Sequence, residues 1–322
     1  MTIKVWSQRG IALILVLWIV SLLAIAAVSF SLFTRSEVQA MTAYKEGMEN
    51  KFLAEAGLRR AIAEILYRKA NAGKPVLEEG SEIFQCDGTV YTMKLADGHY
   101  RIKITDESGK ISLNSLTDQN TMMLKNLLLN RGIGDEPAAI VVDSILDWKD
   151  KDNVHRLNGA EDEYYLSLKT PYRARNGDFE TLDELFMVRG LSPSVLLGVY
   201  RQKGMISHFT VYLKSDKINL NVAAPEVLRA IPGISNEMIE SVLQYRALKE
   251  EEKVSSISSW LGPAFNAIAP YVTDRESNVY SIEAMGYRVS ERRHYSLHAV
   301  VMIEGTQKYR FLNFKSPALF EP

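Results

Sequence analysis

Cysteine is nearly absent from this chain: Cys86 is the only one among 322 residues, so no disulfide within the chain can stabilise the fold. Neither sign of charge is in clear excess, because 38 Lys and Arg face 39 Asp and Glu. A net charge of −1 gives no general attraction to nucleic acid or to an anionic membrane surface. With 47% apolar and 24% charged residues the composition is that of a folded globular protein, and the length allows about two domains.

Recognisable catalytic motifs are also missing. The sequence has no HExxH zinc motif and no GxSxG nucleophile turn, and Gly109-Lys110 lacks the upstream glycine spacing of a phosphate-binding loop. Cys86 has no partner near it in sequence that would activate a thiol. The histidines are scattered along the chain and are His99, His155, His208, His294 and His298. These absences predict that the protein is not an enzyme.

One long uncharged run lies near the N-terminus. Residues 11–33 contain no charge in 23 positions, and as a helix they would extend roughly 35 Å, enough to cross a bilayer core. Lys4 and Arg9 precede the run, and the first acid is Glu37. Because positive charge favours the cytoplasmic side, the sequence predicts a single-pass anchor with the bulk of the chain outside the cytoplasm. A cleaved secretory signal is the alternative, but the run is long for one and lacks a small-residue exit.

The junction before the run carries a more specific signal. Arg9 and Gly10 lie directly against the apolar segment, and this arrangement resembles a prepilin-type signal, at which a membrane peptidase cuts after the glycine. The resemblance implies cleavage after Gly10, with Ile11 as a new, methylated N-terminus. The hydrophobic segment would be kept in the mature protein.

The helix is predicted to continue to about residue 70, since breakers are few before Gly73 and Pro75. Gly47 and Gly57 are places at which it could bend. Apolar residues recur at spacings of three and four along one face, namely Val38, Met41, Tyr44, Met48 and Phe52, and later Ile62, Ile65 and Leu66. An anchor followed by an amphipathic helix resembles the layout of pilins and pseudopilins, in which the first half of the helix packs against other subunits.

Five segments are predicted to form one antiparallel sheet on this helix. They are residues 90–95, 100–105, 279–288, 294–303 and 308–314. Apolar and polar residues alternate in the second segment, and Asp97-Gly98 is a strong turn signal between the first two. In the fourth segment, one face can be filled by Tyr295, Leu297, Ala299, Val301 and Ile303. Gly305-Thr306 separates the last two segments.

About 160 residues of different character lie between the two parts of this sheet, and they hold an internal repeat. The sequence ISLN at 111–114 recurs as INLN at 218–221, and each copy is followed by a helical stretch, a glycine turn and another helix. The turns contain Gly132 and Gly233, and a third turn at Gly190 follows a predicted helix at 181–187. Helix, glycine turn, helix is the helix-hairpin-helix pattern.

That pattern raises a DNA-binding hypothesis, because amides at a helix N-terminus can hold a phosphate. The side chains argue against it. Asp135 and Glu136 follow the first turn, and Glu237 and Glu240 follow the last, where a DNA-binding module would have Lys or Arg. The segment is therefore predicted to be an all-helical structural module, with no nucleic acid as a partner.

The whole arrangement resembles the GspK family, the large minor pseudopilin of type II secretion systems. Residues 144–152, then Gly159-Ala160-Glu161 and Tyr164-Tyr165, are similar to that family's DWxDxD…GAExxYY signature, and ISLN and INLN also match its pattern. The resemblance implies an α+β fold: a long N-terminal transmembrane and amphipathic helix on an antiparallel pseudopilin sheet, with a large all-helical insert of helix-hairpin-helix or SAM-like type. The expected divisions are a leader peptide at 1–10, a transmembrane segment at 11–33, helix and first strands at 34–112, the insert at 113–274 and the remaining strands at 275–322.

The family resemblance also bears on assembly. Most pilin-like subunits have Glu at the fifth position after cleavage, where this chain has Leu15. A carboxylate in an apolar bundle needs a partner, which in the family is the free amine of a neighbouring subunit. Its absence fits a tip subunit with nothing above it. The implied partners are other minor pseudopilins in a tip complex, the prepilin peptidase and the inner-membrane secretion platform. The implied location is the bacterial inner membrane, with the C-terminal part in the periplasm.

An acidic loop is the one candidate ligand site. Six acids fall within 17 residues, opposed by Lys149, Lys151 and Arg156; they are Asp147, Asp150, Asp152, Glu161, Asp162 and Glu163. Clustered carboxylates suit a hard cation, calcium above all, although a solvated loop that screens its own charge is the alternative. The loop is no EF-hand, because Val154 occupies the third ligand position. Members of the GspK family carry calcium in the helical domain, so the resemblance favours calcium, with Asp147, Asp150, Asp152, Glu161 and Asp162 as candidate ligands.

The expected function is that of a minor pseudopilin at the tip of the type II secretion pseudopilus. It would start or cap assembly and support protein export across the outer membrane. Two alternatives stay open at this point: a membrane-tethered helix-hairpin-helix DNA receptor, and a minor pilin of a type IV pilus, which shares the signal and the layout.

Overall fold

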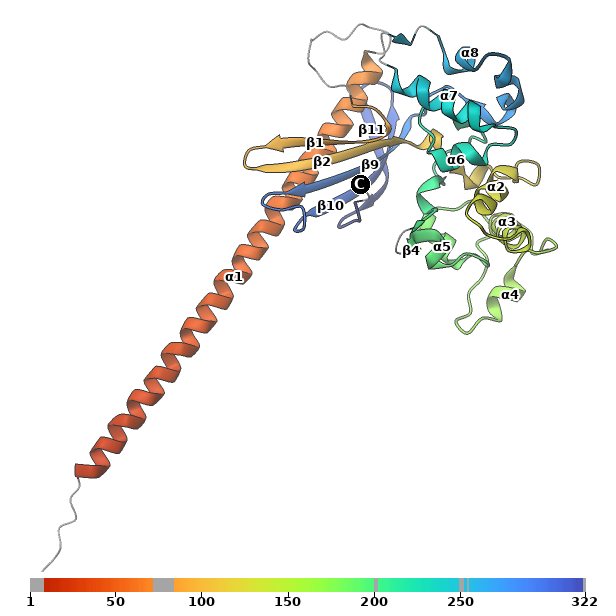
Figure 1. The fold of residues 1–322 in the computed structure, drawn as a ribbon. Coiled ribbons are helices and arrows are strands. Elements are labelled where there is room, and N and C mark those ends of the chain that lie inside the picture. The colour runs from red at the N-terminus through yellow and green to blue at the C-terminus, as the bar shows by residue number, and fades with distance from the viewer. Residues whose placement is uncertain (1–8, 72–83, 200–201, 249–251, 254, 321–322) are drawn as a thin grey trace, which may run out of the picture.

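A computed structural model describes residues 9–71, 84–199, 202–248, 252–253 and 255–320. The first element, α1 (Arg9–Ala70), is one helix of 62 residues that projects far beyond the rest of the molecule (Figure 1). It runs without interruption through Gly47 and Gly57. Arg68 and Lys69 lie in its last turn, where positive charge is favourable to the helix dipole.

The predicted antiparallel sheet is confirmed. Its strands are β1 (Asp87–Leu95), β2 (Gly98–Asp106), β9 (Val279–Tyr287), β10 (Tyr295–Glu304) and β11 (Lys308–Lys315). They lie in the order β1-β2-β9-β10-β11, and every neighbouring pair is antiparallel. Strands from the two ends of the chain therefore meet at β2 and β9. Local alternation predicted each strand, but only the fold brings the second strand beside the ninth.

The turn between β1 and β2 lies one residue earlier than predicted. Leu95 pairs with Gly98, so the two turn residues are Ala96 and Asp97, and Ala96 takes the positive φ of 53°. Gly98 instead begins β2 at a crowded point: a Cβ there would lie 2.4 Å from Cδ1 of Leu53. The glycine is needed for close contact with α1 and not for the conformation of the turn.

The C-terminal part of α1 packs against one face of the sheet. Ala54, Leu58, Ala61, Ile62 and Ile65 of the helix are buried against alternate residues of the strands. Glycines permit this approach on both sides, as Gly57 contacts Tyr100 and Ile102 and a Cβ on Gly286 would lie 2.2 Å from the backbone oxygen of Asn50. The predicted inward face of β10 is confirmed, with Leu297, Ala299, Val301 and Ile303 buried in the same cluster and Tyr295 packed against it.

The insert between β2 and β9 is mainly helical. Its helices are α2 (Met122–Asn130), α3 (Asp135–Lys149), α4 (Asp162–Leu166), α5 (Pro193–Leu197), α6 (Pro225–Ala230), α7 (Asn236–Ala247) and α8 (Ile257–Leu261). Short 3₁₀ turns lie at Glu107–Gly109, Leu113–Ser115, Leu182–Met187, Ile206–His208, Gly262–Ala267 and Ala269–Tyr271. It is not all-helical as expected, because three two-stranded ladders connect these pieces: β3 (Ile111–Ser112) with β6 (Phe209–Thr210), β4 (Gly198–Val199) with β5 (Gln202–Lys203), and β7 (Ile218–Asn219) with β8 (Val272–Thr273).

The sequence repeat is also a repeat in three dimensions. In the first copy β3 pairs in parallel with β6, and the amide of Asn114 donates to the carbonyl of Val211, 2.8 Å away, just after β6. In the second copy β7 pairs in parallel with β8, and the side-chain amide of Asn221 donates to the backbone carbonyl of Asp274, 3.1 Å away, just after β8. The asparagine that ends each copy of the motif therefore fixes the strand that closes that copy.

A basic residue in the last turn of the second helix completes each copy. Lys149 of α3 donates to the carbonyls of Leu113, at 3.3 Å, and Leu116, at 2.7 Å. Arg246 of α7 donates to the carbonyls of Leu220 and Ala223, which hold the same places in the second motif. Both glycine turns have φ of +80°, at Gly132 and Gly233, as the helix, glycine turn, helix pattern requires. The third predicted turn, at Gly190, has φ of +86° and follows a 3₁₀ segment in place of the expected helix.

The described residues form two hydrophobic cores, one between α1 and the sheet and one inside the insert. Buried polar groups hold the two connections between them. Asp106, at the end of β2, accepts hydrogen bonds from the backbone of Ser108 at 2.8 Å and from the backbone of Ser277 at 2.9 Å. Because Ser108 leads into the insert and Ser277 leads out of it, one carboxylate fixes where the insert joins the sheet.

Candidate functional site

The first half of α1 is an apolar surface with nothing packed on it among the described residues. Residues 12–45 are exposed throughout, including Leu15, whose exposed fraction is 57%. Within the described chain, one helix is long and apolar enough to cross a membrane, judged by length and composition alone, and it is α1. A free helix in water would not keep so much apolar surface exposed, so this half of α1 requires a bilayer or other protein chains around it.

The expected processing residues lie at the start of this helix. Gly10 and Ile11 fall in the first turn of α1, which begins at Arg9. A cut between them would remove only Arg9 and Gly10 from α1 and leave the helix from Ile11 to Ala70 in one piece. The geometry is therefore compatible with the predicted cleavage, which stays a prediction.

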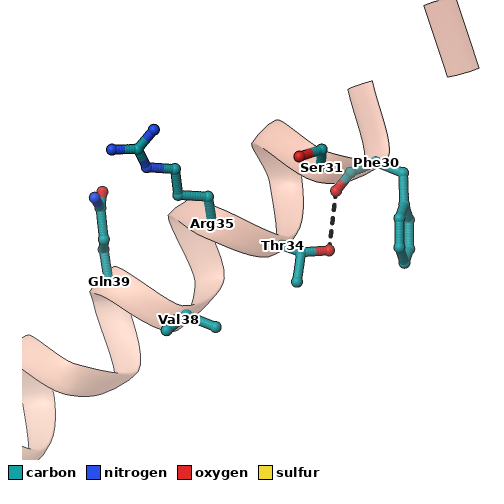
Figure 2. A pocket seen from close by; sticks show the side chains of 6 residues that line it. All are labelled: Phe30, Ser31, Thr34, Arg35, Val38 and Gln39. Carbon is teal, nitrogen blue, oxygen red and sulfur yellow. Dashed lines mark hydrogen bonds between the residues drawn. The ribbon is translucent and has the colours of Figure 1, made fainter. Parts of the chain in front are cut away.

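The predicted amphipathic face divides between two environments. Val38, Met41, Tyr44 and Phe52 are exposed, whereas Ile62 and Ile65 are buried against the sheet. A shallow hollow lies near the start of the exposed part, lined by Phe30, Ser31, Thr34, Arg35, Val38 and Gln39 (Figure 2). Every lining residue belongs to α1, and the hydroxyl of Thr34 donates to the carbonyl of Phe30 at 2.9 Å within the same helix. The hollow is thus part of the helix surface and not an enclosed ligand site.

The acidic loop brings three of its predicted residues together. One carboxylate oxygen from each of Asp147, Asp150 and Glu161 lies within 4.8 Å of the others. Asp147 is in the last turns of α3, Asp150 caps the C-terminus of that helix, and Glu161 precedes α4. Asp147 is fully buried and Glu161 is 3% exposed. Carboxylates so close together and so dry repel one another unless a cation lies among them.

Arg156 is the cation that the described structure places at this cluster. Its Nη1 lies 2.6 Å from Oδ1 of Asp147 and 2.6 Å from Oδ2 of Asp150. Its Nε donates to Oδ1 of Asp118 at 2.9 Å, and its backbone N–H donates to Oδ2 of Asp147 at 3.1 Å. Burial raises the pKa of Asp147, and the bonds to Arg156 oppose that rise.

Glu161 is the member of the cluster without a partner. Within the part of the chain that the structure describes, neither of its side-chain oxygens has a hydrogen-bond partner, and Oδ1 of Asp150 is also unpartnered. Burial and, to a smaller extent, repulsion from the neighbouring carboxylates of Asp147, Asp150, Asp152 and Asp162 together raise the pKa of Glu161 to about 7. One oxygen each of Asp147, Asp150 and Glu161 lies near the other two, and such a set of carboxylates fits a hard divalent cation such as calcium.

A glycine makes room beside the cluster. A Cβ on Gly159 would lie 1.8 Å from Oδ2 of Asp147, and the carbonyl of Gly159 accepts a hydrogen bond from Arg189 at 2.9 Å. Only glycine permits the loop to pass this close to the buried carboxylate. Gly159 thus lets the loop pack directly against Asp147.

Two predicted ligands lie outside this cluster. Asp162 is bound to Arg173 at 2.6 Å and to the backbone N–H of Ala174 at 2.9 Å. Asp152 accepts a hydrogen bond from the backbone N–H of Val154 at 2.9 Å. Both carboxylates are near enough to raise the pKa of Glu161. Their oxygens do not lie within the group formed by Asp147, Asp150 and Glu161.

Sequence reasoning did not assign three residues that shape this cluster: Asp118, Arg156 and Gly159. In the sequence, Arg156 is recognisable only as a charge that opposes the acids, and Gly159 only as part of a motif. Asp118 gives no signal in the sequence, because it precedes α2 and lies 38 residues before Arg156, the residue that connects it to the loop.

The glycine turns carry acids, as the sequence predicted. Asp135 and Glu136 lie in the first turn of α3, and Glu237 lies in the first turn of α7. Lys125 is paired with Asp135 at 2.9 Å. The charge at these helix N-termini therefore opposes phosphate binding.

Comparisons with known proteins agree on one family. The family model described as "Type II secretion system (T2SS), protein K" matches residues 109–200, which include the acidic loop. Type II secretion system protein K of Pseudomonas aeruginosa is 26% identical over 300 residues, covering 88% of this chain and 86% of that protein. A putative protein K of Escherichia coli K12 is 24% identical over 287 residues, covering 85% of this chain and 86% of that protein.

A solved structure has the same fold. One chain of the GspK-GspI-GspJ complex from the type 2 secretion system of enterotoxigenic Escherichia coli matches with a TM-score of 0.57. The match covers 89% of this chain and 99% of that chain at 15% identity. The fold of most of this chain thus recurs in a protein of known structure.

Proposed function

We propose that this chain, which is similar to the type II secretion system protein K family, is the minor pseudopilin at the tip of a type II secretion pseudopilus. The observation that carries the proposal is the division of α1: an exposed apolar first half and a second half that bears the sheet, with the insert attached beyond it (Figure 1). The role is mechanical. The exposed half lies in the membrane until it packs against other subunits, and the insert blocks a further subunit from stacking above.

Leu15 supports the position at the tip. A repeating subunit needs a carboxylate there to neutralise the amine of its neighbour, and Leu15 supplies none. The relative of known structure is named as part of a complex with GspI and GspJ. By analogy, we expect this chain to assemble with two other minor pseudopilins and to act with the inner-membrane secretion platform, starting or capping the pseudopilus.

Co-purification tests this role. The full chain, extracted in detergent, should retain tagged minor pseudopilins of the same host. Serine at both Met41 and Tyr44 should reduce the retained amount several-fold without lowering the melting temperature, because both side chains are exposed. Lys45→Ser changes an exposed polar residue on the same stretch and should leave retention unchanged. Equal retention by the double variant would show that this face makes no contact with the partners.

We also propose that a prepilin peptidase cuts after Gly10 and that the rest of the chain lies in the periplasm. Lys4 and Arg9 precede the apolar run, so the leader stays in the cytoplasm, where the peptidase meets it. Gly10→Ala should leave only the longer precursor on a gel and in the mass spectrum, whereas Gly47→Ala in the same helix should be processed normally. Normal cleavage of the Gly10 variant would refute this assignment.

The third part of the proposal is that Asp147, Asp150 and Glu161 hold a calcium ion. The unpartnered oxygens of Glu161 support it, because a buried carboxylate without a partner is costly. Calcium would bind the loop to the end of α3 and so stiffen this side of the insert. No chemistry on a substrate is needed for that role.

Calcium binding is tested by calorimetry and by melting of the detergent-extracted chain with and without a chelator. Chelation should lower the melting temperature of the wild type. Glu161→Gln and Gly159→Ala should abolish that difference, the first by removing a ligand charge and the second by displacing the carboxylate of Asp147. Glu163→Gln changes an exposed acid two residues away and should retain it. A wild type that neither takes up calcium nor responds to chelation would refute the calcium site alone.

A further inference from the structure

We propose that Arg156 is a built-in competitor for the cation at the cluster of Asp147, Asp150 and Glu161, and that it sets the affinity of the site. The inference rests on the calcium site proposed above. It arises because the guanidinium and a bound ion draw on the same carboxylates, while Glu161 is left to the ion alone.

The contacts of Arg156 divide into an inner and an outer set. The inner contact is Nη1, which bridges Asp147 and Asp150 at 2.6 Å each. The outer contacts are Nε and Nη2, which bind the two oxygens of Asp118 at 2.9 and 3.3 Å. Asp118 is largely exposed. Arg156 therefore still has Asp118 as a partner of opposite charge if a metal ion displaces its guanidinium from Asp147 and Asp150.

Two backbone hydrogen bonds of Arg156 keep the loop in place during such an exchange. The N–H of Arg156 donates to Oδ2 of Asp147 at 3.1 Å, and the carbonyl of Arg156 accepts from Gly159 at 3.0 Å. These bonds do not depend on the guanidinium. The side chain can thus withdraw toward Asp118 while the loop keeps its path around the cluster.

The electrostatic consequence has a definite sign. An ion bound to Asp147 and Asp150 would have a guanidinium as a close neighbour of like charge, and it would first have to weaken two short ion pairs. Both effects reduce the affinity for calcium compared with the same carboxylates without the arginine. The site should therefore fill only at the high calcium concentrations at which extracellular modules bind the ion. When calcium is absent, the ion pairs of Arg156 should hold the loop together.

Calorimetric titration of the detergent-extracted full chain with calcium chloride tests this role. Arg156→Gln should bind calcium about tenfold more tightly than the wild type, because a neighbouring positive charge has been removed. The same variant should melt at a lower temperature in the presence of chelator and gain more from calcium than the wild type does. Arg173→Gln is the matched control: Arg173 binds Asp162 outside the cluster, so its loss should change the affinity less than about twofold.

Arg156→Lys covers the case in which the glutamine variant does not fold, which far-UV circular dichroism would show. Lysine keeps the charge but cannot bind Asp118 with two nitrogens while bridging the inner pair, so we expect calcium binding about threefold tighter than in the wild type. Affinity equal to or weaker than that of the wild type in a folded variant would overturn the role of Arg156 and leave the calcium site standing. Absence of calcium binding in both wild type and variants would overturn both.

Discussion

The two copies of the repeat in the insert share one frame and differ in what is attached to it. Both have a short strand, two helices around a glycine turn, and a closing parallel strand held by an asparagine. After α3, however, the first copy continues into the loop with Asp150, Arg156 and Glu161, whereas α7 of the second copy ends without such a cluster among the described residues. The frame provides stability, and the proposed ligand site is an addition to one copy.

The insert also shows how short, irregular elements are stabilised. In the sheet, backbone groups bond to one another along the ladders, so side chains need only pack. In the insert, long polar side chains satisfy backbone carbonyls that no ladder reaches, as Lys149 and Arg246 do. A large stability loss is therefore expected from single polar substitutions in the insert.

The largest test removes those two basic residues. Lys149→Met and Arg246→Met should each cost about 2 to 3 kcal/mol of unfolding free energy, because each leaves buried carbonyls without donors while sparing the cost of burying a charge. Thermal melting checks this, with the exposed Lys169→Met as a control that should change little. Unequal losses would show that the two copies are not equivalent frames.

A second, smaller difference between the copies should appear at low pH. His208 precedes β6 in the first copy, where Tyr271 precedes β8 in the second. His208 is 8% exposed, and burial lowers its pKa to about 4. The unfolded chain protonates His208 more readily than the folded chain does. The neutral, buried His208 therefore contributes its full stability above about pH 6.5 and loses it as the pH falls toward 4; by pH 5 the loss is about 2 kcal/mol of unfolding free energy.

Comparing His208→Gln with the wild type isolates this contribution from the other titrating groups. Glutamine does not titrate, so the variant should lose less stability than the wild type between pH 7 and pH 5, measured by denaturant unfolding. The charged groups that act on His208 are Glu226, Arg131 and Lys110, and all three are kept in both proteins. Identical pH dependence in the two proteins would exclude His208 as the source.

The smallest expected difference is at the glycine turns. Gly132→Ala should cost about 1 kcal/mol, since its φ of +80° is unfavourable for alanine but the added methyl meets nothing within 4 Å. Gly233→Ala should cost about 2 kcal/mol, because it has the same φ and its methyl would also lie 3.3 Å from the carbonyl oxygen of Ala267. Thermal melting of both variants checks the order, and a reversed order would mean that packing at these turns is not decisive.

Much of the fold could be predicted from local patterns. The uncharged run, the spacing of apolar residues in α1 and the alternation in β2 and β10 each predict one element, because burial on one face leaves a period in the sequence. The glycine turns at Gly132 and Gly233 were predicted for the same local reason. The turn at Ala96 was placed one residue late, because Gly98 serves contact with Leu53, which no local pattern reveals.

The candidate site was predicted only in part. The clustered acids predict a ligand site in this loop, and Asp147, Asp150 and Glu161 do lie close together there. Asp162 belongs instead to Arg173, and Asp118 joins through Arg156 from a distant segment. The sequence pattern does not distinguish between carboxylates that are close together in the chain. Only the packing of the folded protein decides which of them are buried and which pair with a basic side chain.

By itself, then, the sequence determined the anchor, the long helix, the strands and the presence of a repeat, since each is fixed by the order of apolar, polar and glycine residues along a short stretch. The tertiary structure alone decided that β2 pairs with β9 across the insert, that Lys149 and Arg246 hold equivalent carbonyls, and that Glu161 is buried without a partner. These depend on contacts between residues far apart in the chain, and such contacts are selected by the packing of the whole molecule.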